Sequence, residues 1–313
     1  ETDDGEIGWG EAIGDLHDEV EQALTAIGER VEGSSIHDIT RTIETQRKTR
    51  FWRDGPVLDT ALSALEMALW DLKGKEFGAP IHELLGGRVR ERVRASRNLW
   101  GNTPEEFANS AREAMSQSMT AVKVSPAGPT PDVASRTALN GMVDVVSAVR
   151  DAVGPNVDLA IDLHGRLTPA ASRRAVHALA PLDPFFIEEP CLPDGSASHL
   201  ADLRALRTAQ PVAISTGERY RSPHAFAQHL LPSPVVDIIQ PDVSMVGGIR
   251  ASVEIGAMAS AAQVSMAPHC PYGPIQFAAS MQVAAASPAH LIQEFQSLGG
   301  AGSGGGTPGG GQN

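Results

Sequence analysis

Helical periodicity dominates the first part of the chain. Apolar residues recur with the spacing of a helix between residues 15 and 50, with one break at Gly33. A longer helix follows, for which we expect Asp59 to be the N-terminal cap and Gly74 to be the end. Residues 80–85 predict one further helical turn, so this region is expected to form a small helical layer.

The first eleven residues predict the second half of a β-hairpin. Asp4 and Gly5 are a favoured turn pair, and Ile7, Trp9 and Glu11 then alternate with glycines, as side chains alternate between the two faces of a strand. A hairpin strand needs a partner, which would have to precede this segment. We therefore expect the natural beginning of the protein to lie upstream of the sequence.

The rest of the chain alternates between strand-like and helix-like stretches. Eight apolar runs of strand type end near Ser96, Ser125, His164, Pro190, Glu218, Ser244, His269 and Gln296. Helix-like stretches between them include Pro104–Ser116, Leu139–Val153 and Ala170–Ala180. This order is typical of parallel α/β folds, and eight strands fit a closed barrel better than an open sheet. No Gly-x-Gly-x-x-Gly follows the first strand, which argues against a dinucleotide-binding fold.

Charge and cysteine content narrow the functional classes. Acidic residues outnumber basic ones by 38 to 25, and the net charge of −13 argues against a nucleic-acid surface. Cys191 and Cys270 lie far apart and suggest no disulfide framework, which fits a reducing cytoplasm. Neither a long apolar run nor a signal peptide is present, so we expect neither membrane insertion nor export. Residues 299–313 predict a glycine-rich flexible tail.

The stretch from Asp158 to Arg166 carries the first candidate chemistry. Its apolar front half ends in Asp162 and His164, which lie two residues apart and would point to the same face of a strand. Alone, such a pair is more often a turn-stabilising carboxylate and a surface histidine. The pattern gains weight because apolar strands ending in an acid or a histidine recur downstream.

Three consecutive strands end in an acid and predict a metal site. Asp162, Glu188 and Glu218 are separated by 26 and 30 residues, and carboxylates that converge need a cation between them. All-oxygen ligation with room for substrate oxygens favours Mg²⁺, whereas zinc would require histidine or cysteine. A salt bridge or helix cap explains any one of these acids more simply, but not three in register.

Two further strand ends predict a base. Asp242 ends the sixth strand and His269 the seventh, so the carboxylate could fix the tautomer of the imidazole and raise its basicity. With His164 across the cavity, this arrangement suggests chemistry on a carboxylate substrate, in which the metal stabilises the enediolate formed when the α-proton leaves. Glu294 could donate a hydrogen bond if protonated. His164 would protonate a departing β-hydroxyl, which makes the reaction a dehydration.

Five ordered motifs resemble the enolase superfamily and, within it, the mandelate racemase subgroup. They are Asp-Leu-His-Gly-Arg at 162–166, Phe-Ile-Glu-Glu-Pro at 186–190, Thr-Gly-Glu-Arg at 216–219, Gln-Pro-Asp-Val-Ser at 240–244 and Ala-Pro-His-Cys-Pro at 267–271. Gly-Trp-Gly-Glu at 8–11 also matches. The resemblance implies an α/β fold, a modified (β/α)7β TIM barrel with an α+β capping domain that is incomplete at both chain ends. It divides the chain into a capping domain at 1–90, a barrel at 91–298 and the tail.

The resemblance also implies roles for single residues. The metal ligands would be Asp162, Glu188 and Glu218, with Glu188 preferred to Glu189 because the family uses the first glutamate. His269 would be the base assisted by Asp242, His164 the acid, and Glu294 would stabilise the intermediate. Other branches use Lys-x-Lys on the second strand. Here Ser125 replaces the second lysine and leaves Lys123 alone, which disfavours chemistry through two lysines.

The expected function is a Mg²⁺-dependent dehydratase of a sugar acid, an aldonate such as D-galactonate, which becomes a 2-keto-3-deoxy acid. Two alternatives stay open. Phe295 and the glycine-rich tail depart from the family and suggest a non-catalytic metal-binding relative, whereas His164 and His269 on opposite faces would also suit a racemase or epimerase. We expect a cytoplasmic homo-oligomer whose partner is the small sugar acid, without nucleic acid or membrane.

Substrate recognition is assigned to loops of the capping domain and to three side chains near the strand ends. The loops are Ala12–His17 and Phe51–Gly55, and the side chains are those of Arg166, Arg219 and Tyr220.

Overall fold

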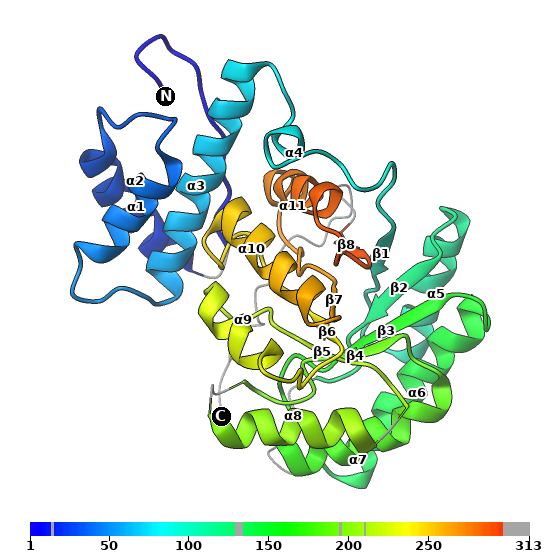
Figure 1. The fold of residues 1–313 in the computed structure, drawn as a ribbon. Coiled ribbons are helices and arrows are strands. Elements are labelled where there is room, and N and C mark those ends of the chain that lie inside the picture. The colour runs from blue at the N-terminus through cyan, green and yellow to red at the C-terminus, as the bar shows by residue number, and fades with distance from the viewer. Residues whose placement is uncertain (14–15, 129–133, 194–195, 210, 297–313) are drawn as a thin grey trace.

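Eight parallel strands form the centre of the molecule. A computed structural model describes residues 1–13, 16–128, 134–193, 196–209 and 211–296. The strands are β1 (Ala95–Asn98), β2 (Ala121–Val124), β3 (Asp158–Asp162), β4 (Phe186–Glu188), β5 (Ile214–Thr216), β6 (Ile238–Ile239), β7 (Ser265–Met266) and β8 (Gln293–Phe295). Their order is β7-β6-β5-β4-β3-β2-β1-β8, and a parallel bridge between Met266 and His290 joins β7 to the segment before β8 (Figure 1). The predicted modified barrel is confirmed.

Helices connect successive strands and cover the outside of the sheet (Figure 1). They are α5 (Pro104–Ser116), α6 (Arg136–Val153), α7 (Pro169–Leu179), the short 3₁₀ helix η2 (Ala180–Leu182), α8 (Ala197–Ala209), α9 (Pro223–Leu230), α10 (Gly248–Ala261) and α11 (Pro274–Ala286). The sequence sets several helix starts directly. Thr103, Ser135, Thr168 and Ser222 each accept a hydrogen bond from the backbone N–H three residues ahead, which satisfies a donor in the first helical turn.

The N-terminal helices form a separate layer beside the barrel. The layer consists of α1 (His17–Val31), α2 (Ile39–Lys48) and α3 (Pro56–Phe77), and the short α4 (Ile81–Leu84) leads into the barrel (Figure 1). Val20, Ile27, Ile43 and Leu62 pack into one apolar cluster, as helical periodicity predicted. The proposed domain boundaries at residues 90 and 298 stay a prediction, and the glycine-rich tail lies outside the described residues.

The first eleven residues do not form the predicted hairpin strand. The turn at Asp4 is present, but the segment pairs with no strand among the described residues and runs along α3 instead. The backbone N–H of Trp9 donates to Asp71, and Lys75 donates to the carbonyl of Ile7. A Cβ at Gly10 would lie 1.9 Å from the carbonyl oxygen of Ala64 on α3, so the alternating glycines serve close packing against a helix.

Two predicted limits of α3 are also wrong. The helix begins at Pro56 after Gly55, and Asp59 is a buried residue within its first turns, where it forms an ion pair with Arg47. The helix continues past Gly74 to Phe77 and ends at Gly78, which has the left-handed conformation of a helix C-cap. An isolated glycine costs a helix about 1 kcal/mol, which the packing of this long helix outweighs.

Two smaller observations bear on the class of protein. Cys191 and Cys270 are both buried, and neither forms a disulfide within the described part of the chain. Across the described ranges, no helix combines the length and the apolar character that crossing a bilayer would require.

Acid should weaken the closure of the barrel through His290, which lies in the bridge to β7. Burial, followed by the charge of Arg90, lowers the pKa of His290 to about 3. Between pH 6.5 and 3, His290 therefore binds a proton in the unfolded chain but not in the folded protein. The free energy of unfolding decreases as the pH is lowered, by up to about 1.4 kcal/mol per pH unit. In His290→Phe this loss should be smaller, as measured by urea unfolding at pH 7, 6, 5 and 4.

The control for this prediction is the exposed His224. His224→Phe should leave the acid dependence of the free energy of unfolding as in the wild type. Parallel wild-type and His290→Phe curves over the whole range would show that His290 is not the group responsible.

Candidate active site

The inner face of the barrel has an apolar floor and a polar layer above it. Six buried residues form the floor, namely Ala121, Ala160, Phe186, Ile238, Ala267 and Ile292. Two residues further along each strand lie Lys123, Asp162, Glu188, Gln240, His269 and Glu294. Side chains two residues apart share a face, so these polar groups point into the barrel as the floor residues do. Because they come later along each parallel strand, they lie nearer its carboxyl end. The carboxyl ends of parallel strands are where barrel enzymes carry out their chemistry.

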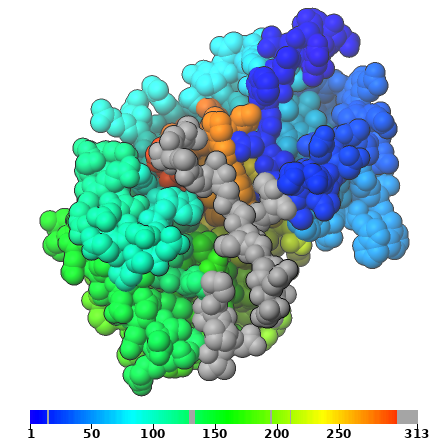
Figure 2. Space-filling view, turned by 180° about the vertical axis from the view of Figure 1, so that it is seen from behind, coloured from blue at the N-terminus to red at the C-terminus, as the bar shows by residue number. Residues whose placement is uncertain are grey.

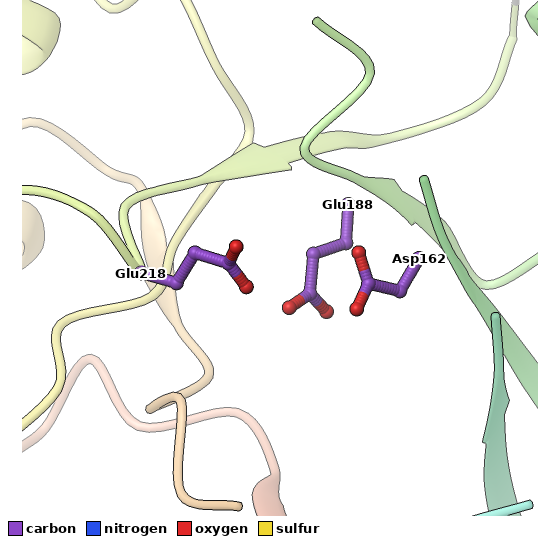
Figure 3. A group of neighbouring side chains, drawn as sticks. All are labelled: Asp162, Glu188 and Glu218. Atoms are coloured by element: carbon purple, nitrogen blue, oxygen red, sulfur yellow. The ribbon is translucent and has the colours of Figure 1, made fainter. Parts of the chain in front are cut away.

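Asp162, Glu188 and Glu218 converge at this end. Each offers a carboxylate oxygen within 4.8 Å of the others, and all three side chains are buried (Figure 3). Asp162 and Glu188 are direct partners in the register of β3 and β4, and Glu218 lies two residues beyond β5. Burial and the surrounding carboxylates raise the pKa of Glu188 well above its usual range, although Lys123 acts in the opposite direction.

The donor set fits a hard divalent cation. It consists of carboxylate oxygens only, and the Oε2 atom of Glu218 has no hydrogen-bond partner among the described residues. Buried carboxylates at this separation repel one another unless positive charge lies between them. Glu189, the alternative to Glu188, is directed elsewhere, because its Oε1 accepts hydrogen bonds from the Thr216 hydroxyl at 2.7 Å and from the Gly217 N–H at 2.8 Å.

His164 lies beside the first of these acids. The chain turns directly after β3, where His164 has a φ of +52°, and its N–H donates to Asp162 Oδ1 at 2.8 Å. Its Nε2 lies 3.0 Å from Asp162 Oδ2. Burial alone would raise the pKa of Asp162, but the hydrogen bond from His164 and the charge of Lys123 outweigh it and lower this pKa to about 2. The carboxylate is therefore ionised and able to bind a cation.

His269 is held by Asp242. The Nδ1 atom lies 2.7 Å from Asp242 Oδ2, and Nε2 lies 3.6 Å from Glu218 Oε2. Burial lowers the pKa of His269, but the hydrogen bond to Asp242 and the nearby carboxylates prevail and raise it to about 10. A cation held by the neighbouring acids would oppose this effect and favour the neutral imidazole that a base requires.

Lys123 is buried between two carboxylates. Its Nζ lies 3.0 Å from Glu188 Oε1 and 2.6 Å from Glu294 Oε1. Burial disfavours the charge, but the surrounding carboxylates outweigh burial and raise the pKa of Lys123 well above its usual range. The residue is therefore a fixed positive charge within the polar layer and not a neutral base.

Glu294 differs from the prediction of a protonated donor. Its carboxylate accepts hydrogen bonds from Asn98 Nδ2 and from the Cys270 N–H, both at 2.7 Å, in addition to the ion pair with Lys123. Burial opposes its ionisation, but Lys123 and then His269 outweigh burial and lower the pKa of Glu294 to about 2. Phe295 packs against Phe277 on α11, so it occupies the opposite face of β8 and leaves Glu294 directed inward.

The polar layer opens into a cavity of about 1270 Å³. Asp162, His164, Glu218, His269 and Glu294 all line it. Four arginines line the cavity as well, namely Arg47, Arg166, Arg219 and Arg221. The two imidazoles therefore line one cavity together with Asp162, Glu218 and several positive charges.

The predicted substrate contacts are placed unequally. Arg166, Arg219 and Tyr220 all line the cavity, but the Tyr220 hydroxyl is engaged within the protein, at 3.2 Å from His199 Nε2 and 3.3 Å from Thr216 Oγ1. In the loop Phe51–Gly55, Asp54 reaches the cavity. In the loop Ala12–His17, Ile13 reaches it, while residues 14 and 15 lie outside the described residues.

Sequence reasoning missed two polar residues of this region. Asn98, at the carboxyl end of β1, lines the cavity and donates to Glu294, and its position could have been found by the same rule that gave the acids. Gln276 on α11 donates to Asp242, and nothing in the local sequence distinguishes it from other helical glutamines.

Two family models match the chain. A model described as Enolase C-terminal domain-like matches residues 106–300, which is more than half of the sequence, and the mandelate racemase / muconate lactonizing enzyme N-terminal domain matches residues 1–86. The chain belongs to the mandelate racemase subgroup of the enolase superfamily. The predicted family is thereby confirmed.

Individual relatives within the enolase superfamily agree with this assignment. The D-galactonate dehydratase of Variovorax paradoxus (strain S110) is 36% identical over 300 residues, which cover 96% of this chain and 77% of the relative. The D-gluconate dehydratase of Thermoproteus tenax is also 36% identical, over 92% of this chain and 58% of that relative. The crystal structure of a mandelate racemase/muconate lactonizing enzyme from Sulfitobacter sp. superimposes with a TM-score of 0.86 at 32% identity, covering 94% of this chain and 78% of that chain.

Proposed function

We propose that this enolase-superfamily protein is a Mg²⁺-dependent sugar-acid dehydratase, which removes the α-proton and the β-hydroxyl of an aldonate to give a 2-keto-3-deoxy acid. The observation that carries the proposal is a cluster of three buried carboxylates, two of which, Asp162 and Glu218, line the same cavity as the two imidazoles. The names of the curated relatives, D-galactonate dehydratase and D-gluconate dehydratase, support the same reaction and substrate class.

Asp162, Glu188 and Glu218 would hold the cation. When bound there, Mg²⁺ would bind the carboxylate of the substrate and neutralise the negative charge that develops as the α-proton leaves. Lys123 adds a fixed positive charge at the same end of the barrel, between Glu188 and Glu294. Together these groups would bring an anionic substrate into an acidic protein.

His269 is assigned as the base. Its Nδ1 faces Asp242, so Nε2 is the nitrogen left to accept the α-proton. The assignment requires a neutral imidazole, which Asp242 orients and which the bound cation favours. His269 is mostly buried within the cavity wall, so that the proton is exchanged with the substrate in preference to bulk water.

His164 is assigned as the acid. Its proton passes to the β-hydroxyl, the carbon–oxygen bond breaks, and water leaves as the α-proton is taken up by His269. The remaining enol rearranges to the 2-keto acid, so no oxidant or reductant is consumed. His164 is more exposed than His269, with 37% of its side chain accessible, which allows it to regain a proton from solvent.

The arginines of the cavity are the proposed contacts of the sugar-acid chain. Arg166 and Arg219 approach from the strand ends, and Arg47 and Arg221 lie beside Asp59 at the capping layer. Guanidinium groups donate several hydrogen bonds in a fixed plane and suit a polyhydroxylated anion.

Incubation with Mg²⁺ and a panel of aldonates, including D-galactonate and D-gluconate, tests the proposal. We expect at least one to yield its 2-keto-3-deoxy product, detected as the keto acid. Exchange of the α-hydrogen with deuterated water without loss of the hydroxyl would favour an epimerase instead. Mg²⁺ binding without any turnover would favour a non-catalytic relative, and either result would overturn the dehydratase assignment.

A further inference from the structure

Asp242 has two oxygens, and only one of them faces His269. Oδ2 accepts the hydrogen bond from the imidazole, while Oδ1 accepts from the side chain of Gln276 at 2.8 Å and from the Ser244 N–H at 2.7 Å. Asp242 and Gln276 are both fully buried. The Gln276 amide is thus the one side-chain donor recorded for Asp242 among the described residues besides His269 itself.

The orientation of the Gln276 side chain is fixed by the loop that carries His269. Its amide oxygen accepts the Tyr272 N–H at 2.9 Å, so its NH₂ group must be the end that faces Asp242. In the flipped orientation, the amide oxygen of Gln276 would face the Asp242 carboxylate, and the two oxygens would repel each other. The contacts therefore select one orientation of the amide.

The backbone of Gln276 is fixed in turn by the N-terminal segment. Glu11 Oε2 accepts the N–H groups of Gln276 at 2.9 Å and of Ile275 at 3.0 Å, and Glu11 Oε1 accepts the Gly273 N–H at 2.5 Å. A carboxylate is favourable at this position because the first turn of α11 exposes unpaired N–H donors. Glu11 therefore caps the helix that carries Gln276.

The Glu11 carboxylate lies close against the backbone of Gly273. A Cβ at Gly273 would lie 2.3 Å from Glu11 Oε1, so a larger residue there would displace the carboxylate from the loop. Figure 2 shows the N-terminal segment, in blue, lying against the orange region that contains α11. The Gly-Trp-Gly-Glu motif at 8–11 thus ends in a side chain that reaches the barrel loop between His269 and α11.

We propose that Gln276 is a positioning residue for the His269–Asp242 pair, and that Glu11 of the N-terminal segment holds Gln276 in place. The expected effect on kcat rests on the proposed dehydratase function, whereas the expected effect on the orientation of His269 does not. Without the Gln276 amide, Asp242 Oδ1 keeps only the Ser244 N–H, and the carboxylate can rotate away from His269. The imidazole would then lose the fixed direction of its Nε2.

Variants at Gln276 test this inference. Gln276→Met has a similar volume and no donor, and Gln276→Asn keeps the amide but is one methylene too short to reach Asp242. Both should lower the kcat of aldonate dehydration by about 10- to 100-fold with KM nearly unchanged, because the base is misdirected while the substrate is still bound. A loss confined to KM would contradict the inference.

Glu11→Gln, with Glu66→Gln as its matched control, distinguishes an effect of Glu11 on Gln276 from the general effect of losing a helix cap. Glu66 on α3 is a buried carboxylate that, like Glu11, accepts backbone N–H groups at the start of a barrel helix, namely those of Ile249 and Arg250 at the start of α10. Glu11→Gln should lower kcat about tenfold, and adding Gln276→Met should lower it no further than Gln276→Met alone. The effects of Glu66→Gln and Gln276→Met on kcat should be additive in the double variant. Additive effects of Glu11→Gln and Gln276→Met would show that Glu11 does not act through Gln276.

A spectroscopic measurement keeps the inference testable without turnover. In protein labelled with ¹⁵N-histidine, the Nδ1 proton of His269 should give a low-field resonance that is absent from His269→Asn. Gln276→Met and Glu11→Gln should shift or broaden this resonance, and Glu66→Gln should not. If the resonance responds but no aldonate is converted, the dehydratase assignment fails and the positioning role stands. If neither the resonance nor kcat responds to Gln276→Met in the folded protein, the positioning role is overturned.

Discussion

Replacing His269 by asparagine is expected to lower the kcat of aldonate dehydration by about 10²- to 10⁴-fold, the usual contribution of a general base. The asparagine amide can still donate to Asp242, so the buried carboxylate keeps a partner while the basic Nε2 is lost. Stability should therefore change little. The measurements are the rate of keto-acid formation, the exchange of the α-hydrogen with deuterated water, and the melting temperature.

His229→Asn is the matched control for this experiment. His229 is also buried, with Nδ1 2.9 Å from the carbonyl oxygen of Ala225, but it does not line the cavity. The control should lose stability and keep its kcat. A His269→Asn variant with the full rate of dehydration and exchange would remove His269 from the reaction and leave His164 as the remaining imidazole of the cavity.

Replacing Glu218 by glutamine should abolish the stabilisation of the protein by Mg²⁺. At a concentration of about 100 times its Kd, a cation that binds only the folded protein contributes about 2.7 kcal/mol. Glu218→Gln removes one of three charged ligands and leaves an Oε2 position that lacks a hydrogen-bond partner among the described residues. Calorimetric titration and the melting temperature with and without Mg²⁺ measure the effect.

The affinity for Mg²⁺ should also rise with pH. Burial and then the surrounding carboxylates raise the pKa of Glu188, and the hydrogen bond to Asp242 and the nearby carboxylates raise the pKa of His269 to about 10 despite burial. A cation at this site favours the deprotonated form of both groups, so its binding is linked to proton release, which a higher pH makes easier. Titrations in buffers of different ionisation enthalpy should therefore report proton release.

Glu189→Gln is the control that tests the choice between the two adjacent glutamates. Glu189 is as buried as Glu188, but it is bonded to Thr216 and Gly217, and this variant should still bind Mg²⁺. Loss of binding in Glu189→Gln together with normal binding in Glu218→Gln would show that the three acids are not the ligand set.

The convergence of the acids could be predicted from the sequence because it depends on local rules. The side chains of a strand alternate, parallel strands in a barrel end at the same face, and Asp162 and Glu188 follow an apolar residue on that face by two positions. The same rule applies to His269 and Glu294. Errors arose where tertiary contacts decide. The glycines of residues 1–11 look like strand alternation but serve contact with α3, and Asp59 looks like a cap but is buried against Arg47.

By itself, therefore, the sequence determined the family, the barrel and the set of residues at its carboxyl end, since periodicity and ordered motifs are written along the chain. Only the tertiary structure decided two features. The first is the ionisation of Glu294, which depends on the contact with Lys123 on β2, and the second is the connection from Glu11 through Gln276 to Asp242. Both depend on residues that are far apart in the sequence. Electrostatic and hydrogen-bond energies are set by distances of a few ångströms and by burial, and neither quantity is fixed until the chain is folded.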